Sequence, residues 1–255
     1  MSDRIRALIR QRADPSRVPV LQSFFKTGPG QYAEGDVFIG VTVPDLRKVC
    51  RECVGAPLDE IEPLLQSKVH EERLLALLLL VEAFSRGSEP ERARVYRFYL
   101  SHTAFINNWD LVDSSAAAIV GGWLEKRPRT ALRRLARSRS LWERRIAIVA
   151  THYFIRRGDF ADTFAIADVL LGDGHDLIHK AAGWMLREVG NRDGRALRDY
   201  LKPRHQRMPR TMLRYAIEKF PESERRGYLT QRTAASSRGS STNSSSPRKA
   251  PSAKR

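Results

Sequence analysis

Apolar residues recur at helical spacing along almost the whole chain. Side chains three and four positions apart share one face of a helix, and this spacing returns from the N-terminus to Phe220. Short stretches rich in Gly, Pro, Ser and Asp separate the periodic segments. The pattern predicts helices over residues 3–13, 18–25, 44–53, 58–66, 70–85, 89–100, 108–125, 129–137, 141–156, 159–170, 176–189, 194–201 and 209–220.

Strand-like alternation is confined to one run, DVFIGVTV, at residues 36–43. A doubly wound α/β fold needs several such runs alternating with helices, so that class is excluded. The sequence therefore predicts an all-α protein.

The more apolar helices repeat with a period near 35 residues. ERRIAIV, HKAAGWM and MLRYAIE align by Ala147, Ala182 and Ala216, which stand 35 and 34 residues apart. A period of this length with two helices per unit is typical of HEAT-like repeats. We therefore expect one domain, residues 1–232, folded as a right-handed superhelical solenoid.

The repeat also aligns cations and tryptophans in two columns. The first column reads Trp109, Arg145, Lys180 and Arg214, and the second, four residues on, reads Asp113, Val149, Trp184 and Glu218. Equivalent positions of a solenoid stack into a ridge, and its inner helices line a concave surface. We expect these side chains to line a basic concave groove, with cations for phosphate and aromatic faces for sugar or base.

The net charge points to the same class of partner. The formal charge is +16 and the sequence pI is about 10.5, which favours a polyanion such as nucleic acid. Residues 233–255, TAASSRGSSTNSSSPRKAPSAKR, hold five of these cations and no acid, so the rest of the chain keeps +11. With no aromatic residue, this stretch is predicted to be a disordered basic tail.

Neither a membrane segment nor a secretion signal is expected. No run of about 18 apolar residues occurs, and the opening MSDRIRALIRQR is typical of an amphipathic helix rather than a signal peptide. We expect a monomer in the cytoplasm, associated with the nucleoid if the protein is bacterial.

Three motifs are candidates for a cofactor or metal site. VCREC carries a lone C-x-x-C without a second ligand pair, and HDLIH, residues 175–179, resembles a zinc helix but lacks a third ligand. TGPGQYAEGDVFIG, residues 27–40, has four glycines but no phosphate-loop signature. We expect no cofactor and no metal, and we interpret the last motif as a connector that can also touch DNA through Lys26 and Tyr32.

The four tryptophans fall into two groups. Trp123 and Trp142 are interpreted as packing residues. Trp109 and Trp184 can also be core residues, but their column neighbours are charged, which favours the groove.

Asp113 and Arg145 each have a structural alternative. Asp113 can cap its helix, although Asn108 and the polar residues beside it are better placed to do so. Arg145 can serve only as an ion-pair partner of Glu143 or Asp113. Both alternatives stay open from the sequence.

Several segments together resemble the AlkD-type family of DNA alkylation repair proteins, which are HEAT-like-repeat DNA glycosylases. They are FFKTGPGQYAEGDVFIGVTVPDLRK, HEERLLALLLLV, NNWDLVDSSA, LWERRIAIV, HDLIHKAAGWMLREVG and PRTMLRYAIEKF. The resemblance implies excision of purines alkylated at N3 or N7 without base flipping, and it carries Trp109, Asp113, Arg145 and Trp184 over as site residues. Asn108 departs from the best-known branch, which has an aromatic residue there, so the lesion preference stays open.

The chemistry of such lesions agrees with the two columns. An N3- or N7-alkylated purine is cationic and leaves readily, so the enzyme must chiefly stabilise an oxocarbenium-like sugar and place a water. Asp113 suits that role, Trp109 and Trp184 can hold the sugar and the base by cation–π contact, and Arg145 can clamp a phosphate. The remaining groove cations expected to bind DNA are Lys180, Arg187 and Arg214.

A second class of function is a non-catalytic solenoid that binds nucleic acid or a protein partner through the same groove. A carboxylate facing phosphates weakens such binding, so the presence of Asp113 beside Trp109 favours the enzyme. We therefore expect duplex DNA with alkylated purines as the partner.

Overall fold

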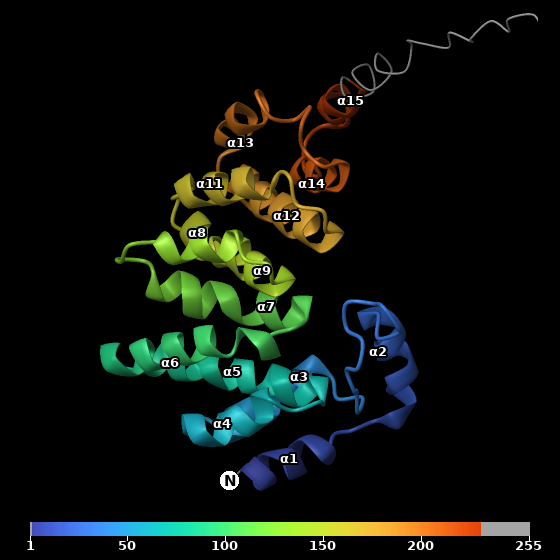
Figure 1. Cartoon of the computed structure of the whole chain (residues 1–255), viewed down its shortest axis with the longest axis vertical. Helices are drawn as coiled ribbons and strands as arrows, with labels where there is room; N and C mark the ends of the chain where they lie inside the picture. Colours follow the sequence, from blue (N-terminus) through green and yellow to red (C-terminus); the bar gives the residue numbers. More distant parts are fainter. Residues whose placement is uncertain (1, 231–255) are drawn as a thin grey trace, which may run out of the picture.

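Helices stacked in two layers make up most of the molecule, for which a computed structural model describes residues 2–230 (Figure 1). The inner layer holds α5 (His70–Arg86), α7 (Trp109–Ala116), α9 (Leu141–Ala150), α12 (Asp176–Arg192) and α14 (Arg210–Ala216). The outer layer holds α4 (Leu58–Leu65), α6 (Glu89–Ser101), α8 (Thr130–Ala136), α11 (Ala161–Leu170) and α13 (Gly194–Leu201). Successive inner helices pack on one another, and outer helices pack on the inner ones. The fold is an all-α helical-repeat solenoid, as predicted.

Shorter elements complete the chain at both ends and between the layers. They are α1 (Ser2–Arg10), η1 (Pro15–Arg17), α2 (Val18–Phe25), α3 (Val43–Glu52), η2 (Thr103–Phe105), η3 (Ala117–Gly121), α10 (His152–Ile155) and α15 (Glu222–Thr230). In Figure 1, α2 stands apart from the stack, beside the ends of α3 and α7. The chain therefore returns toward the inner layer between α2 and α3.

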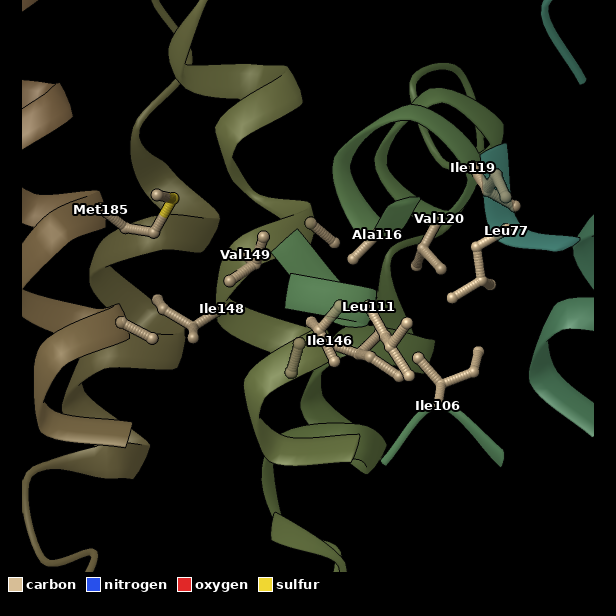
Figure 2. Close-up of a cluster of buried hydrophobic side chains, with 14 of the residues drawn as sticks. Leu77, Ile106, Leu111, Ala116, Ile119, Val120, Ile146, Ile148, Val149 and Met185 are labelled. Carbon is tan, nitrogen blue, oxygen red and sulfur yellow. The ribbon is translucent and has the colours of Figure 1, made fainter. Parts of the chain in front are cut away.

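The core lies between the two layers and runs along the stack. Figure 2 shows part of it, where Leu77 of α5, Leu111 of α7 and Ile146 of α9 meet. All three side chains are fully buried, and each such burial contributes about 1.5–3 kcal/mol. This packing fixes the spacing of the inner helices, and therefore the spacing of the side chains on their free faces.

The strand-like run at 36–43 forms no sheet within residues 2–230, where a single parallel bridge joins Val37 to Val69. Gly40 interrupts the run, because its φ of +85° is not that of a strand, and Gly35, just before the run, has the same φ. We call residues 27–40 the glycine-rich segment.

Two predicted helices are interrupted, and one helix was not predicted. The helix predicted over 108–125 contains a π-helical turn, η3, where Gly121 passes so close to α9 that a Cβ would lie 2.4 Å from the Ala150 carbonyl oxygen. The helix predicted over 141–156 breaks at Thr151, whose hydroxyl donates to the Ile148 carbonyl oxygen at 2.7 Å. α15 was missed because its sequence, ESERRGYLT, lacks a clear apolar stripe.

No helix among residues 2–230 is long and apolar enough to cross a membrane. The predicted tail, 233–255, lies outside the described residues.

Candidate active site

α7 begins at Trp109 because the residue before it caps the helix. Asn108 is extended, with φ −146° and ψ 159°, and its side-chain oxygen accepts from the Trp109 backbone N–H at 2.8 Å. Asp110 adds a negative charge to the first turn, where the helix dipole favours it. The cap is therefore Asn108, as the sequence favoured, and Asp113 is free for another role on the face it shares with Trp109.

Asp113 forms a two-point ion pair with Arg145 of α9. Arg145 Nε donates to Asp113 Oδ1 at 2.9 Å, and Nη2 donates to Oδ2 at 2.8 Å. The third nitrogen, Nη1, donates to the Leu177 carbonyl oxygen at 2.6 Å. Arg145 is only 5% exposed, so its guanidinium ties α7, α9 and α12 together. This geometry favours the pairing alternative for Arg145 over contact with a phosphate.

The surroundings of Asp113 shift its protonation. Burial raises the pKa of the Asp113 carboxyl above its ordinary value, and Asp110 adds to the rise, while Arg145 partly offsets both. The side chain still keeps 19% of its surface exposed. Asp113 is thus a largely desolvated carboxylate with one open side, at which charge interactions are stronger than in water.

Trp109 sits within an aromatic cluster that the sequence did not predict. Phe25 stacks on its indole, with ring centroids 5.3 Å apart and planes at 19°, and Phe24 meets it edge-on at 5.7 Å. Phe24 is nevertheless 61% exposed. One face of the Trp109 indole is therefore covered by α2, and the apolar surface around it extends to Phe24. The only sequence signal was the pair of phenylalanines at the end of the short α2.

A buried ionic network fixes the start of α7 to α5. His70 lies 2.7 Å from Asp110 through Nε2 and 3.3 Å from Asp36 through Nδ1. Arg73 Nη2 donates to Asp36 at 2.7 Å. Burial disfavours the charged imidazole, but its hydrogen bonds to both carboxylates outweigh this effect and raise the pKa of His70. Asp36 belongs to the glycine-rich segment, so the network joins three separate parts of the chain.

Glu71 holds the end of the glycine-rich segment on α5. Its Oε1 accepts from three successive backbone N–H groups, at 3.1, 2.8 and 3.3 Å, which belong to Ile39, Gly40 and Val41. Nearby, Phe25 and Phe38 flank the His70 ring at 4.8 and 4.7 Å. The HEER motif at the start of α5 thus positions the segment, which sequence reasoning interpreted mainly as a connector.

Trp184 lies further along the inner layer, on α12. Its indole N–H donates to Glu188 at 3.1 Å, and the His152 ring lies 6.0 Å away. Within the described residues its ring and hydrogen-bond contacts involve these groups and not Trp109 or Asp113. Val149, which the column places between Asp113 and Trp184, is 1% exposed. The structure therefore joins Asp113 directly to Arg145 and places Trp184 as a separate, half-buried group.

The three predicted DNA-binding cations differ in how far they are neutralised. Lys180 pairs with Asp176 at 2.8 Å, and both groups are about half exposed. Arg187 pairs with Glu218 of the next repeat. Arg214 is exposed, and no ion pair involves it among residues 2–230. Arg214 is therefore the one of the three that retains its full charge toward solvent.

Comparison with known proteins decides the family. The sequence pattern of the family described as DNA alkylation repair enzyme matches residues 5–220, which is most of the chain. The chain belongs to the DNA alkylation repair enzyme family. The resemblance found in the sequence is thereby confirmed, and with it an enzymatic role in the repair of alkylated DNA.

A solved structure agrees with the fold of this DNA alkylation repair enzyme. It is described as a predicted DNA alkylation repair enzyme from Enterococcus faecalis, and it superposes with a TM-score of 0.65 at 17% sequence identity. The match covers 83% of this chain and 98% of the other. At this identity the likeness shows the shared fold. A comparison with curated protein sequences found no match.

The zinc-like motif of the repair enzyme has local structural roles. His175 is the N-cap of α12, as its place before the helix suggested, and its Nδ1 accepts from the Leu177 N–H at 3.2 Å. His179 Nε2 lies 2.5 Å from the Asp173 carbonyl oxygen. Over residues 2–230, no group of three or more His, Cys, Asp or Glu side chains is arranged to hold a metal ion.

Proposed function

We propose that this chain is a DNA glycosylase that hydrolyses the N-glycosidic bond of cationic N3- and N7-alkylated purines in duplex DNA. The observation that carries the proposal is the Asp113 carboxylate, largely desolvated and held at both oxygens by Arg145, one helical turn from a partly exposed tryptophan. Membership in a family of DNA alkylation repair enzymes supports the reaction class.

In the proposed reaction, the electron pair of the glycosidic bond leaves with the purine. The C1′–N9 bond breaks, its electron pair moves to N9, and the cationic alkylpurine leaves as a neutral base. The positive charge then rests on the sugar as an oxocarbenium-like centre, which the Asp113 carboxylate stabilises. Water adds at C1′, and its proton passes to Asp113 or to solvent. The products are a free alkylpurine and an abasic sugar.

Selectivity in this proposal comes from electrostatics rather than from a deep base pocket. A neutral purine is a poor leaving group. An N3- or N7-alkylated purine is positively charged, and the electron pair of the broken bond neutralises it, so it leaves readily. The enzyme then has no need to rotate the nucleotide out of the helix, as most glycosylases do. Trp109 and Trp184 would contact the cationic nucleotide through their π faces, each contributing about 0.5–2 kcal/mol.

Arg145 takes the role of a positioning residue. Because its nitrogens are engaged by Asp113 and by Leu177, it orients the carboxylate and lowers its pKa against the effect of burial. Contacts with the DNA backbone are assigned to Lys180, Arg187 and Arg214, of which Arg214 has the most accessible charge.

One observation favours the second class of function, a non-catalytic solenoid that binds nucleic acid or a protein partner. Both oxygens of Asp113 already accept hydrogen bonds from Arg145, as in a purely structural ion pair. The two proposals predict different results with a damaged substrate.

The deciding experiment measures base release. Duplex DNA treated with a methylating agent is incubated with the protein in excess, and the released 7-methylguanine and 3-methyladenine are quantified against a no-enzyme control. We expect both bases to be released, and unmodified purines to remain. If the protein binds the duplex but releases no alkylated base, the glycosylase proposal is wrong and the binding solenoid takes its place.

A further inference from the structure

The outer layer carries a dense group of cations that the candidate site does not use. Residues 126–139, KRPRTALRRLARSR, hold seven cations and no acid. They run from the turn before α8, through α8 itself, to the turn before α9. α8 packs on α9 and α11, and in Figure 1 it lies on the side of the stack opposite α2. These cations are therefore separate from the free faces of the inner helices.

Two of the seven cations fix the turn before α8 to its neighbours. Arg127 places its guanidinium 3.6 Å from the centroid of the Trp123 indole and pairs with Glu89 of α6. Arg129 pairs with Asp162 of α11 at 2.7 Å. Because this turn is held at two points, the cations that follow it project from a fixed backbone.

The four arginines that follow have no such partners. Arg133, Arg134, Arg137 and Arg139 are exposed, and none of them forms an ion pair within the described residues. The helix dipole favours Arg133 and Arg134, which lie in the last turn of α8. Arg137 stands three and four residues beyond them, however, at spacings where like charges repel. A bound polyanion would relieve this repulsion. We call these four residues the outer basic patch.

A hollow of about 580 Å³ joins the outer basic patch to α6. It is lined by Leu100 of α6 and by Arg134 and Arg137 of the patch. Among the described residues that line it, Glu143 is the one acid, and its carboxylate accepts a hydrogen bond from Thr103 at 2.8 Å. The cations outnumber the acid in this hollow, which favours an anionic occupant.

The chemistry of the patch favours a nucleic-acid backbone over an acidic protein. The strongest contacts of a protein interface are large, desolvated anchor side chains. The leucines of α8, Leu132 and Leu135, are buried in the core and offer no such anchor. Guanidinium groups, in contrast, bind phosphate through two parallel hydrogen bonds, and binding to a phosphate backbone is driven by charge alone.

We propose that the outer basic patch binds the backbone of a second segment of duplex DNA while the inner layer holds the first. The inference rests on the proposed function for the identity of the first ligand, but the second contact needs no lesion. Because the two sites lie on different layers, one molecule can hold two segments at once. It then moves from one segment to the other through a doubly bound state, without first leaving DNA.

The test follows the release of a labelled, undamaged duplex from the protein as unlabelled duplex is added. With a single DNA site, the rate constant for release does not depend on the concentration of the competitor. With a second site, the competitor binds at the patch and replaces the first duplex as it detaches. We expect release from the unchanged protein to accelerate several-fold as the competitor concentration rises.

Two double variants locate the second site. Arg133→Gln with Arg137→Gln removes two charges of the patch and keeps long side chains that suit a helix. The matched control is Arg47→Gln with Arg51→Gln on α3, since these arginines are also exposed, four residues apart and without an ion pair among residues 2–230. The patch variant should lose most of the acceleration, and the control should keep it. Melting temperatures show whether each variant is folded.

Four results would overturn the inference. If release from the unchanged protein does not depend on the competitor, the molecule has one DNA site. If the patch variant keeps the full acceleration, the second duplex binds elsewhere, and if the control loses as much, net charge is responsible. If poly-glutamate or an RNA duplex accelerates release more than the DNA duplex does, the patch serves an acidic protein or RNA. Base release by the unchanged protein is measured separately, so a failure of the glycosylase proposal is seen on its own.

Discussion

Asp113 and Arg145 show what a pair of residues can do that neither does alone. A buried carboxylate without a partner would take up a proton, and a buried guanidinium without one would be strongly unfavourable. Their two-point contact offsets part of the cost of burying both groups in a site that is mostly closed to water. The residue that is proposed to be catalytic is therefore also part of what holds the fold together. Experiments have to separate the catalytic role of Asp113 from its structural role.

Asp113→Asn keeps the shape of the side chain and removes its charge. We expect single-turnover excision to fall about a hundredfold or more, equivalent to about 2.7 kcal/mol of transition-state stabilisation. Binding to duplex DNA should hold or rise, because a negative charge no longer faces phosphates. The melting temperature should also fall, since Arg145 keeps a buried charge without its partner, at a cost of about 3–5 kcal/mol.

The control is a second change, Arg145→Met, made in the Asp113→Asn background. Removing both charges should restore much of the melting temperature and leave excision low. If the double variant excises alkylated bases at the rate of the unchanged protein, the ion pair is structural and the catalytic role of Asp113 is wrong.

At the residue scale, the sequence predicted which side chains share a face but not what they touch. The spacing of Trp109 and Asp113 was sufficient to place both on the free face of α7. Whether Arg145 meets an acid or a phosphate depends on how far α7 lies from α9, and periodicity does not set that distance. The cover provided by Phe25 comes from 84 residues away in sequence, and no local pattern indicates it.

Glycines in the glycine-rich segment differ in what they allow. Gly35 and Gly40 share a φ of +85°, but a Cβ on Gly35 would meet nothing within 4 Å, whereas one on Gly40 would lie 1.9 Å from the Asp14 carbonyl oxygen. We expect Gly35→Ala to cost about 1 kcal/mol of unfolding free energy and Gly40→Ala to cost at least about 3 kcal/mol. Urea denaturation measures both unfolding free energies. Equal losses would mean that the positive φ alone, and not the contact with Asp14, determines the cost of each substitution.

At the scale of elements, α5 does more than contribute to the core. Its first turn carries the network that joins the glycine-rich segment to α7. The sequence placed the start of this helix correctly at His70. The burial of its HEER motif could not be predicted, because it depends on the glycine-rich segment, which packs on the first turn from elsewhere in the chain.

The network predicts a pH dependence of stability. Burial and the charge of Arg73 lower the pKa of His70 in the folded protein, but Asp110 and Asp36 outweigh them and raise it. The contribution of His70 to the unfolding free energy is therefore full below its unfolded pKa of about 6.5. It is lost as the pH rises through the folded pKa. The unfolding free energy of His70→Gln should therefore differ most from that of the unchanged protein in mild acid. His152, whose pKa is lowered chiefly by burial, is the control, and His152→Gln should show the opposite trend. A pH-independent difference for His70→Gln would mean that the imidazole is not charged in the folded protein.

Over the whole molecule, charge and repeat geometry act together. The chain carries a formal charge of +16, and the inner layer presents Arg214 and the weakly paired Lys180 on its repeats. The repeat predicts equivalent points of the stack for Arg145, Lys180 and Arg214, but Arg145 is 5% exposed and pairs with Asp113, so the column does not present it to solvent. The repeat could not predict that Glu218 of one column pairs with Arg187, since that contact crosses between repeats.

Binding to duplex DNA should weaken steeply with salt, by about 0.9 in the slope of log Kd against log salt for each phosphate neutralised. Deleting residues 233–255 should lower the affinity and the slope without changing single-turnover excision, because the five cations there carry no lesion preference. Filter binding over a salt series measures the slope. Affinity that does not depend on salt would exclude the cations of the inner layer as the DNA site. A large loss of excision on deletion would mean that residues 233–255 take part in the reaction.

The aromatic cover of Trp109 has a consequence for how the protein is made. The ribosome releases Phe24 and Phe25 early, but the indole on which they pack follows 84 residues after Phe25. At synthesis rates of about 5–20 residues per second, that interval lasts on the order of ten seconds. During it the nascent chain carries Phe24 and Phe25 without the indole that covers them in the folded protein, so a ribosome stalled before α7 would present apolar side chains that chaperones can bind.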